Sequence, residues 1–148
     1  MGSHYKGSKK EVRALDTYIK LIRAADTLSS GINVNLISTG LTESQFNVLD
    51  ALYHLGPLTQ KQLGKKLLKS GGNITMVIDN LEKRNLVKRR RGEKDRRVFF
   101  VDLTVRGRQQ VENILPEQVS RIKNEMSTLS KGEQNELQRL CKKLGVTV

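Results

Sequence analysis

The densest group of side chains that could do chemistry is a basic cluster between residues 90 and 97. Five of these eight residues are Lys or Arg: Arg90, Arg91, Lys94, Arg96 and Arg97. Guanidinium and ammonium groups at this density suit phosphate oxygens, because they supply both positive charge and hydrogen-bond donors. Asp95 is an acid inside this run, and we expect it to pair with Arg97 or Lys94 and fix that side chain's direction. The cluster therefore predicts contact with a polyanion.

A second group of polar side chains falls on a predicted helix from about Gly71 to Arg84, which Ser70 is placed to cap. Its apolar residues recur at i, i+3, i+4 and i+7, so the other side chains point away from the core. An Asn amide can bond adenine edges or phosphate, Thr and Met can contact a thymine methyl, and glycine lets the backbone approach closely. The residues expected to face DNA are Ser70, Gly72, Asn73, Thr75, Met76 and Asn80.

These two groups are held by a short helix before them and a hairpin around the basic cluster. Residues 59–62, Thr-Gln-Lys-Gln, form a capping box that starts the short helix, and Gln60 and Lys61 are candidate phosphate contacts. Residues 86–90 and 97–103 are rich in β-branched and aromatic residues and flank a polar turn, as in a β-hairpin. The order short helix, turn, helix and hairpin over residues 59–103 predicts a winged helix-turn-helix, whose helix fits the major groove of duplex DNA.

The charge distribution supports this interpretation. The chain of 148 residues has a formal net charge of +12. Residues 59–108 carry 15 Lys and Arg against 5 Asp and Glu, a net charge of +10, and both flanks are nearly neutral. A basic block between neutral flanks favours a polyanionic partner over general solubility.

The flanks predict helices with long apolar faces. One helix is expected from about Glu11 to Leu28; residues 29–40 could be a loop or a second short helix. Thr104 caps a long helix that Pro116 must kink or interrupt, and residues 130–133 begin a last helix with a capping box. Helices with exposed apolar faces need a partner, so the flanks favour a homodimer.

The fold class expected is mostly α with a small β-hairpin wing (α+β): one winged helix-turn-helix with N- and C-terminal dimerisation helices. Residues 1–40 would form the N-terminal dimerisation helix and its connection. Residues 41–107 would form the DNA-binding region, and residues 108–148 the C-terminal dimerisation helices of one structural domain.

Residues 41–107 resemble the MarR family of bacterial regulators. The matching motifs are LTESQF at 41–46, LTQKQL at 58–63, DNLEKRNLV at 79–87, DRR at 95–97 and LTVRG at 103–107. The resemblance implies a triangular helical dimer whose winged units each read half of a near-palindromic site, with Arg97 in the minor groove beside Asp95. Asn85 stands where the family usually has Gly, and residues 71–73 replace its commoner Arg-Pro-Thr type of start.

The remaining candidate residues could detect a signal, either a small ligand or an oxidant. A cavity between the dimer helices and the winged unit could be lined by Phe46, Asp50, Tyr53 and His54, although core packing is the alternative for the apolar ones. Cys141 lies on the apolar face of the last predicted helix and could sense oxidants or electrophiles, or simply pack as a small hydrophobe. No metal-ligand spacing, phosphate-binding loop or catalytic set is present in the sequence, so we expect no metal, no cofactor and no enzyme activity.

The expected function is that of a sequence-specific dimeric regulator, a repressor that a small effector releases from an inverted-repeat operator in double-stranded DNA. The family resemblance implies that this effector is aromatic or amphipathic. A thiol-based repressor using Cys141 and a winged-helix module for RNA or protein are the alternatives. One cysteine suits a reducing cytoplasm, and the family resemblance implies a bacterial one. No apolar run is long enough to span a membrane. Residues 1–4 resemble an expression scar.

Overall fold

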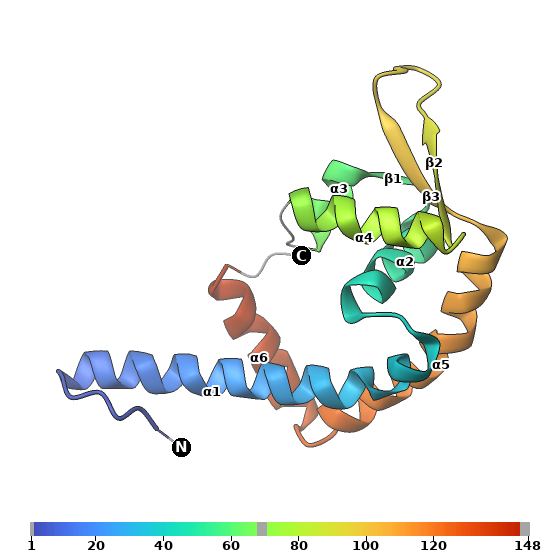
Figure 1. The fold of residues 1–148 in the computed structure, drawn as a ribbon. Helices are drawn as coiled ribbons and strands as arrows, with labels where there is room; N and C mark the ends of the chain where they lie inside the picture. The colour runs from blue at the N-terminus through green and yellow to red at the C-terminus, as the bar shows by residue number, and fades with distance from the viewer. Residues whose placement is uncertain (1, 68–70, 146–148) are drawn as a thin grey trace.

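The computed structural model describes residues 2–67 and 71–145. Most of the chain is helical, and a small antiparallel sheet projects from the helices as a hairpin (Figure 1). In chain order, the elements are α1 (Lys9–Ile32), the 3-10 helix η1 (Asn33–Thr39), α2 (Glu43–Leu55), β1 (Leu58–Thr59), α3 (Gln60–Lys66), α4 (Gly71–Lys83), β2 (Val87–Arg91), β3 (Phe99–Leu103), α5 (Val105–Met126) and α6 (Lys131–Lys143).

Local capping signals begin α2, α3 and α6. Thr42, Thr59 and Ser130 each accept a hydrogen bond from the backbone N–H three residues on, and the Gln or Glu there bonds back to the cap. These reciprocal bonds satisfy backbone donors that a helix start leaves unpaired. Asn85 takes the left-handed conformation, with φ of 59°, and ends α4 without a glycine.

The sheet contains one strand that the sequence did not predict. β3 pairs with β2 from Val87 opposite Leu103 to Arg91 opposite Phe99. It also pairs with β1 on its other side, in the order β1-β3-β2. The two-residue strand β1 thereby ties Phe100 and Val101 of the hairpin to the start of α3.

The structure decides two alternatives that the sequence left open. The segment 29–40 contains a second short helix, as one alternative predicted: α1 continues to Ile32, and the 3-10 helix η1 of seven residues completes the connection. Pro116 does not interrupt α5, which runs through it and curves in Figure 1. Proline leaves the carbonyl four residues earlier without a donor, and both Pro116 and Glu112 are exposed, so water can satisfy that carbonyl.

The hydrophobic core lies in the central unit, among α2, α3, α4, the sheet and the first half of α5. Its fully buried members include Leu49, Leu63, Ile78, Leu81 and Val101. By contrast, α1 and the described part of α6 contain no buried residue. The central unit therefore closes its own core, and the two flanking helices do not. No helix in the described ranges has the length and hydrophobicity needed to cross a membrane.

Candidate nucleic-acid interface

The outer face of α4 (Asn73, Thr75, Met76 and Asn80) is the first part of the candidate interface. All four residues are exposed, and 64% of the surface of Met76 is accessible. The opposite face is anchored by Ile74, Ile78 and Leu81, which are buried in the core. Ser70 lies outside the described residues, and Gly72 belongs to the first turn of α4.

The short helix α3 packs against α4 and fixes it through a polar contact. Gln60 at the start of α3 donates from Nε2 to the hydroxyl of Thr75. The amide of Gln60 is thus engaged within the protein, which makes Gln60 a residue that positions α4. Lys61, the other predicted contact on α3, is exposed.

The wing (residues 87–103: β2, the turn 92–98 and β3) is the second part of the interface. Its turn is tied across by Gly92 N–H donating to Val98 O at 2.8 Å and Val98 N–H donating to Asp95 O at 3.2 Å. A Cβ at residue 92 would approach the Asp95 carbonyl oxygen to 2.7 Å, so the turn needs a glycine there. This tight closure holds the basic tip in one conformation.

Asp95 pairs with Arg97, one of the two partners the sequence allowed. Arg97 donates to Asp95 from its backbone N–H at 3.0 Å, from Nε at 3.1 Å and from Nη2 at 3.3 Å. These hydrogen bonds, the side-chain ones first, hold the pKa of Asp95 below its ordinary value. The Arg97 side chain is 92% exposed, so the clamp fixes its direction while leaving its outer surface open.

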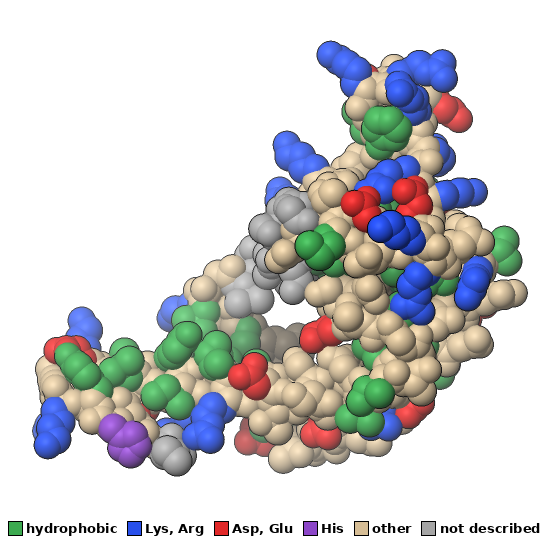
Figure 2. Space-filling view, viewed as in Figure 1, with side chains coloured by type: hydrophobic (Ala, Val, Ile, Leu, Met, Phe, Trp, Pro, Cys, Tyr) green, Lys and Arg blue, Asp and Glu red, His purple; other side chains and the backbone are tan. Residues whose placement is uncertain are grey.

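Two other basic residues of the wing, Arg90 and Arg91, rest on its aromatic side chains. The guanidinium of Arg90 lies 5.4 Å from the Phe100 ring centroid, and that of Arg91 lies 5.0 Å from the Phe99 ring centroid. Such cation–π contacts orient an exposed cation, and Arg90 also lies 4.0 Å from Asp102 Oδ2. Lys94 and Arg96 are exposed at the tip. Figure 2 shows Lys and Arg side chains surrounding the wing and continuing over the neighbouring face of the helices.

Arg89 joins the wing to α4, a role that sequence reasoning missed. It donates to Asp79 Oδ1 at 2.7 Å and to Glu82 Oε1 at 2.8 Å, and its own side chain is 24% exposed. Two acids one turn apart on α4 and a base in β2 were the available signal. The pairings orient the wing relative to the outer face of α4, so we regard Arg89 as a positioning residue.

Arg84 makes a second long-range link that sequence reasoning missed. From the end of α4 it donates to the Gly40 carbonyl at 2.9 Å and to the Thr39 carbonyl at 3.1 Å. These carbonyls end η1, the connection between α1 and the central unit. A displacement of η1 would therefore displace Arg84 and the C-terminal end of α4.

The four predicted cavity residues separate into two pairs. Phe46 and Asp50 line a cavity of about 250 Å³ between α1, η1, α2 and α5. Tyr53 and His54 are not among its lining residues: Arg108 stacks on the Tyr53 ring at 5.3 Å, and His54 is exposed. Cys141 is a half-buried free thiol on α6. Within residues 2–67 and 71–145, no group of three or more His, Cys, Asp or Glu could hold a metal ion.

A helix-turn-helix with an exposed second helix, followed by a basic β-hairpin, defines a winged-helix DNA-binding protein. The model of the MarR family matches residues 41–99. The chain is 33% identical over 134 residues to the HTH-type transcriptional regulator MhqR of Bacillus subtilis, covering 90% of this chain and 92% of MhqR. The chain therefore belongs to the MarR family of DNA-binding transcriptional regulators.

Solved structures agree with this assignment. The S. aureus MepR–DNA complex matches with a TM-score of 0.78 and 25% identity, covering 88% of this chain and 98% of MepR. Bordetella bronchiseptica BpsR, whose DNA binding is regulated by 6-hydroxynicotinic acid, matches with a TM-score of 0.79 and 23% identity over the full length of both chains. The second likeness supports the fold alone.

Proposed function

We propose that the protein is a homodimeric, sequence-specific repressor that covers a near-palindromic operator and is released by a small effector. The observation that carries this proposal is the pairing of an exposed α4 face with an arginine that Asp95 holds outward on the wing. A dimer bound across promoter DNA represses because polymerase needs the same stretch of duplex. Such a protein works in the cytoplasm, where bacterial DNA lies.

Each part of the interface has a separate task in this proposal. Asn73, Thr75 and Met76 contact base edges in the major groove, where each base pair presents a distinct pattern. Ser70 and Gly72, at the start of α4, approach a phosphate, because the positive end of a helix dipole favours an anion. Lys61 and Asn80 contact the backbone beside the groove. The wing follows the DNA backbone through Arg90, Arg91, Lys94 and Arg96, and Arg97 enters the minor groove.

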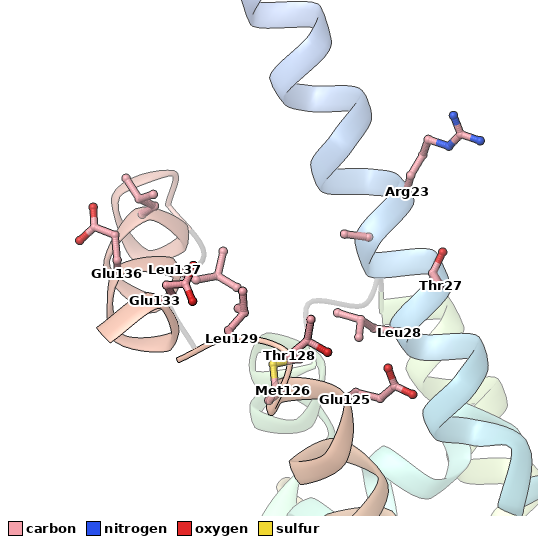
Figure 3. A pocket seen from close by; sticks show the side chains of 12 residues that line it. Arg23, Thr27, Leu28, Glu125, Met126, Thr128, Leu129, Glu133, Glu136 and Leu137 are labelled. Carbon is pink, nitrogen blue, oxygen red and sulfur yellow. The ribbon is translucent and has the colours of Figure 1, made fainter. Parts of the chain in front are cut away.

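Dimerisation is supported by an apolar groove that a single chain leaves open. The groove, about 720 Å³ in volume, lies between α1 and the α5–α6 corner, with Leu28 and Leu137 among its lining residues (Figure 3). Leu140 lines it too, and hydrophobic side chains continue along the free length of α1 (Figure 2). Because α1 and α6 contain no fully buried residue within the chain, their apolar faces suit the same helices of a second copy.

The dimer is tested by placing a charge in the groove. Leu137→Asp should shift the protein from dimer to monomer in analytical ultracentrifugation, because an isolated carboxylate is costly in an apolar interface. Gln138→Asp is the matched control, since Gln138 is exposed on the same helix and does not line the groove. A Leu137→Asp protein that stays dimeric would contradict this interface.

Release by an effector is supported by the 250 Å³ cavity, which lies between the flanking helices and the central unit. A ligand there can change the spacing of the two winged units only through different affinities for two arrangements of the dimer. The test is DNA affinity, measured by fluorescence anisotropy with and without candidate small molecules. A Kd for operator DNA that no cavity-binding molecule changes would contradict the effector part of the proposal.

A further inference from the structure

Met76 is an apolar residue on the side of α4 that faces outward. It is 64% exposed, and it lies midway between Ile74 and Ile78, which are 1% and 0% exposed. Two residues along an α-helix turn through about 200°, so Met76 lies on the side of α4 opposite the core. Asn73 and Asn80, three residues before it and four after it, share that side and are exposed as well. Met76 therefore lies between two amides at the centre of the outer face.

The backbone that carries Met76 is held by the core, by α3 and by the wing. The hydroxyl of Thr75, the preceding residue, is hydrogen-bonded to the side-chain amide of Gln60 on α3. A hydroxyl both donates and accepts, so this bond forms whichever end of the amide faces it. Further along α4, Asp79 Oδ1 accepts a hydrogen bond from Arg89 of β2 at 2.7 Å. The outer face is thus ordered before it meets DNA, which lowers the entropy cost of binding.

An apolar side chain at this place has one kind of partner in the major groove. Base edges there present hydrogen-bond donors and acceptors, and the apolar group among them is the C5-methyl of thymine. Methionine has no hydrogen-bond donor and its thioether is a weak acceptor, but its flexible side chain adapts well to an apolar contact. The amides on α4 and the basic wing (Figure 2) make the surroundings polar and positive, which suits nucleic acid better than the apolar surface of a protein.

We infer that Met76 is a specificity-determining residue that recognises the C5-methyl group of a thymine in each half-site of the operator. This recognition rests on the proposed function and names a base that α4 reads. The contact is apolar, so it depends on the methyl group and not on the hydrogen-bonding groups of the base. A 5-methylcytosine at the same place offers the same methyl group, and uracil and unmodified cytosine lack it.

The experiment uses the duplex that the purified full chain selects from a random-sequence library. Each thymine of the half-site is replaced in turn by uracil, which removes only the C5-methyl group. Kd is measured by fluorescence anisotropy at one fixed salt concentration. At the contacted position, uracil should weaken binding about 4-fold in one half-site and about 16-fold in both, as expected for one or two methyl groups left in water. With cytosine at that position, adding the 5-methyl group should strengthen binding by the same factor.

Met76→Ala tests whether the side chain, and not a change in DNA shape, causes this effect. The variant lacks the contact, so it should bind the thymine and uracil duplexes equally at the position that distinguishes them in the parent. Met76→Leu keeps an apolar side chain and should keep a preference for thymine. Ile37→Ala is the matched control, because Ile37 is a 78% exposed apolar residue on η1, outside the candidate interface. It should keep the full preference.

Three results would overturn the inference: a selected half-site without thymine, equal binding of thymine and uracil at every position, or an undiminished preference for thymine in Met76→Ala. Each of these results leaves the proposed function intact, because the protein still selects a duplex operator. A protein that selects no duplex sequence would contradict the proposed function, and the recognition by Met76 with it.

Discussion

Gly107 lies where the wing meets α5, and replacing it with alanine should unfold the protein at lower temperature. Gly107 is buried in the first turn of α5. A Cβ there would lie 2.0 Å from the carbonyl oxygen of Leu86. That oxygen also accepts the backbone N–H of Thr104 at 3.1 Å, so it cannot move away without weakening the bond that starts α5. The obstruction is backbone, which cannot rotate aside as a side chain can.

The expected loss of folding stability follows from how far the added Cβ would overlap the Leu86 carbonyl oxygen. Opening the contact from 2.0 Å to the 3.0 Å that real Cβ atoms respect requires a backbone shift of 1.0 Å. Overpacking of this kind costs about 1–3 kcal/mol and occasionally more, and we take the upper end because backbone must move. Alanine also stabilises a helix by about 0.5–1 kcal/mol relative to glycine, which offsets part of this cost. The net loss is about 2 kcal/mol, or about 4–8 °C in Tm at 2–4 °C per kcal/mol.

The assay is thermal unfolding followed by circular dichroism, at one fixed protein concentration because dimerisation would couple Tm to concentration. Gly132→Ala in α6 is the control, since the nearest atom to an added Cβ is Ser130 Oγ at 4.0 Å. This change should raise stability by about 0.5–1 kcal/mol. A Gly107→Ala protein as stable as the parent would refute the reasoning.

Three further predictions concern the wing and the thiol. Arg97→Ala should weaken binding to all duplexes and reduce the slope of log K against log salt by up to about 0.9, because one cation in the minor groove no longer displaces counterions from the DNA; an unchanged slope contradicts the role. Since the pKa of Asp95 is lowered in the folded chain, its clamp is present above the ordinary pKa of 3.8 and is lost as pH falls through the lowered value. The Asp95 carboxyl carbon should therefore titrate by NMR at lower pH in the parent than in Arg97→Ala, and equal midpoints would count against the clamp. Cys141→Ser should leave effector-induced release from DNA intact, and any oxidant-induced release that survives the change excludes a thiol switch at Cys141.

Features decided by neighbouring residues could be predicted from the sequence. The capping boxes at Thr42, Thr59 and Ser130 and the left-handed Asn85 depend on bonds within a few residues, and each is present. The hairpin likewise follows from alternating strands around a polar turn. The pairing of Asp95 with Arg97 could be expected for the same reason, because the two are two residues apart.

Features that depend on contacts between distant segments could not be predicted from the sequence. Strand β1 has two residues and exists because β3, about 40 residues later, pairs with it. Arg84 contacts carbonyls 44 and 45 residues earlier, and no local pattern marks such a link. The buried amide of Gln118 was missed because its partner, Asn33, is 85 residues away. The sequence placed Tyr53 beside Asp50 on one helix, but packing of α5 brings Arg108 onto Tyr53 and leaves it outside the cavity lining.

The central claim is that a dimer of this chain reads duplex DNA through the outer face of α4 and the wing. Selection of bound duplexes from a random-sequence library by the purified protein tests it without knowledge of the operator. The account predicts enrichment of an inverted repeat whose half-sites lie about one helical turn apart, bound by two chains and resistant to competition by structured RNA. Failure to enrich any duplex sequence, or displacement of the selected duplex by structured RNA, would contradict it.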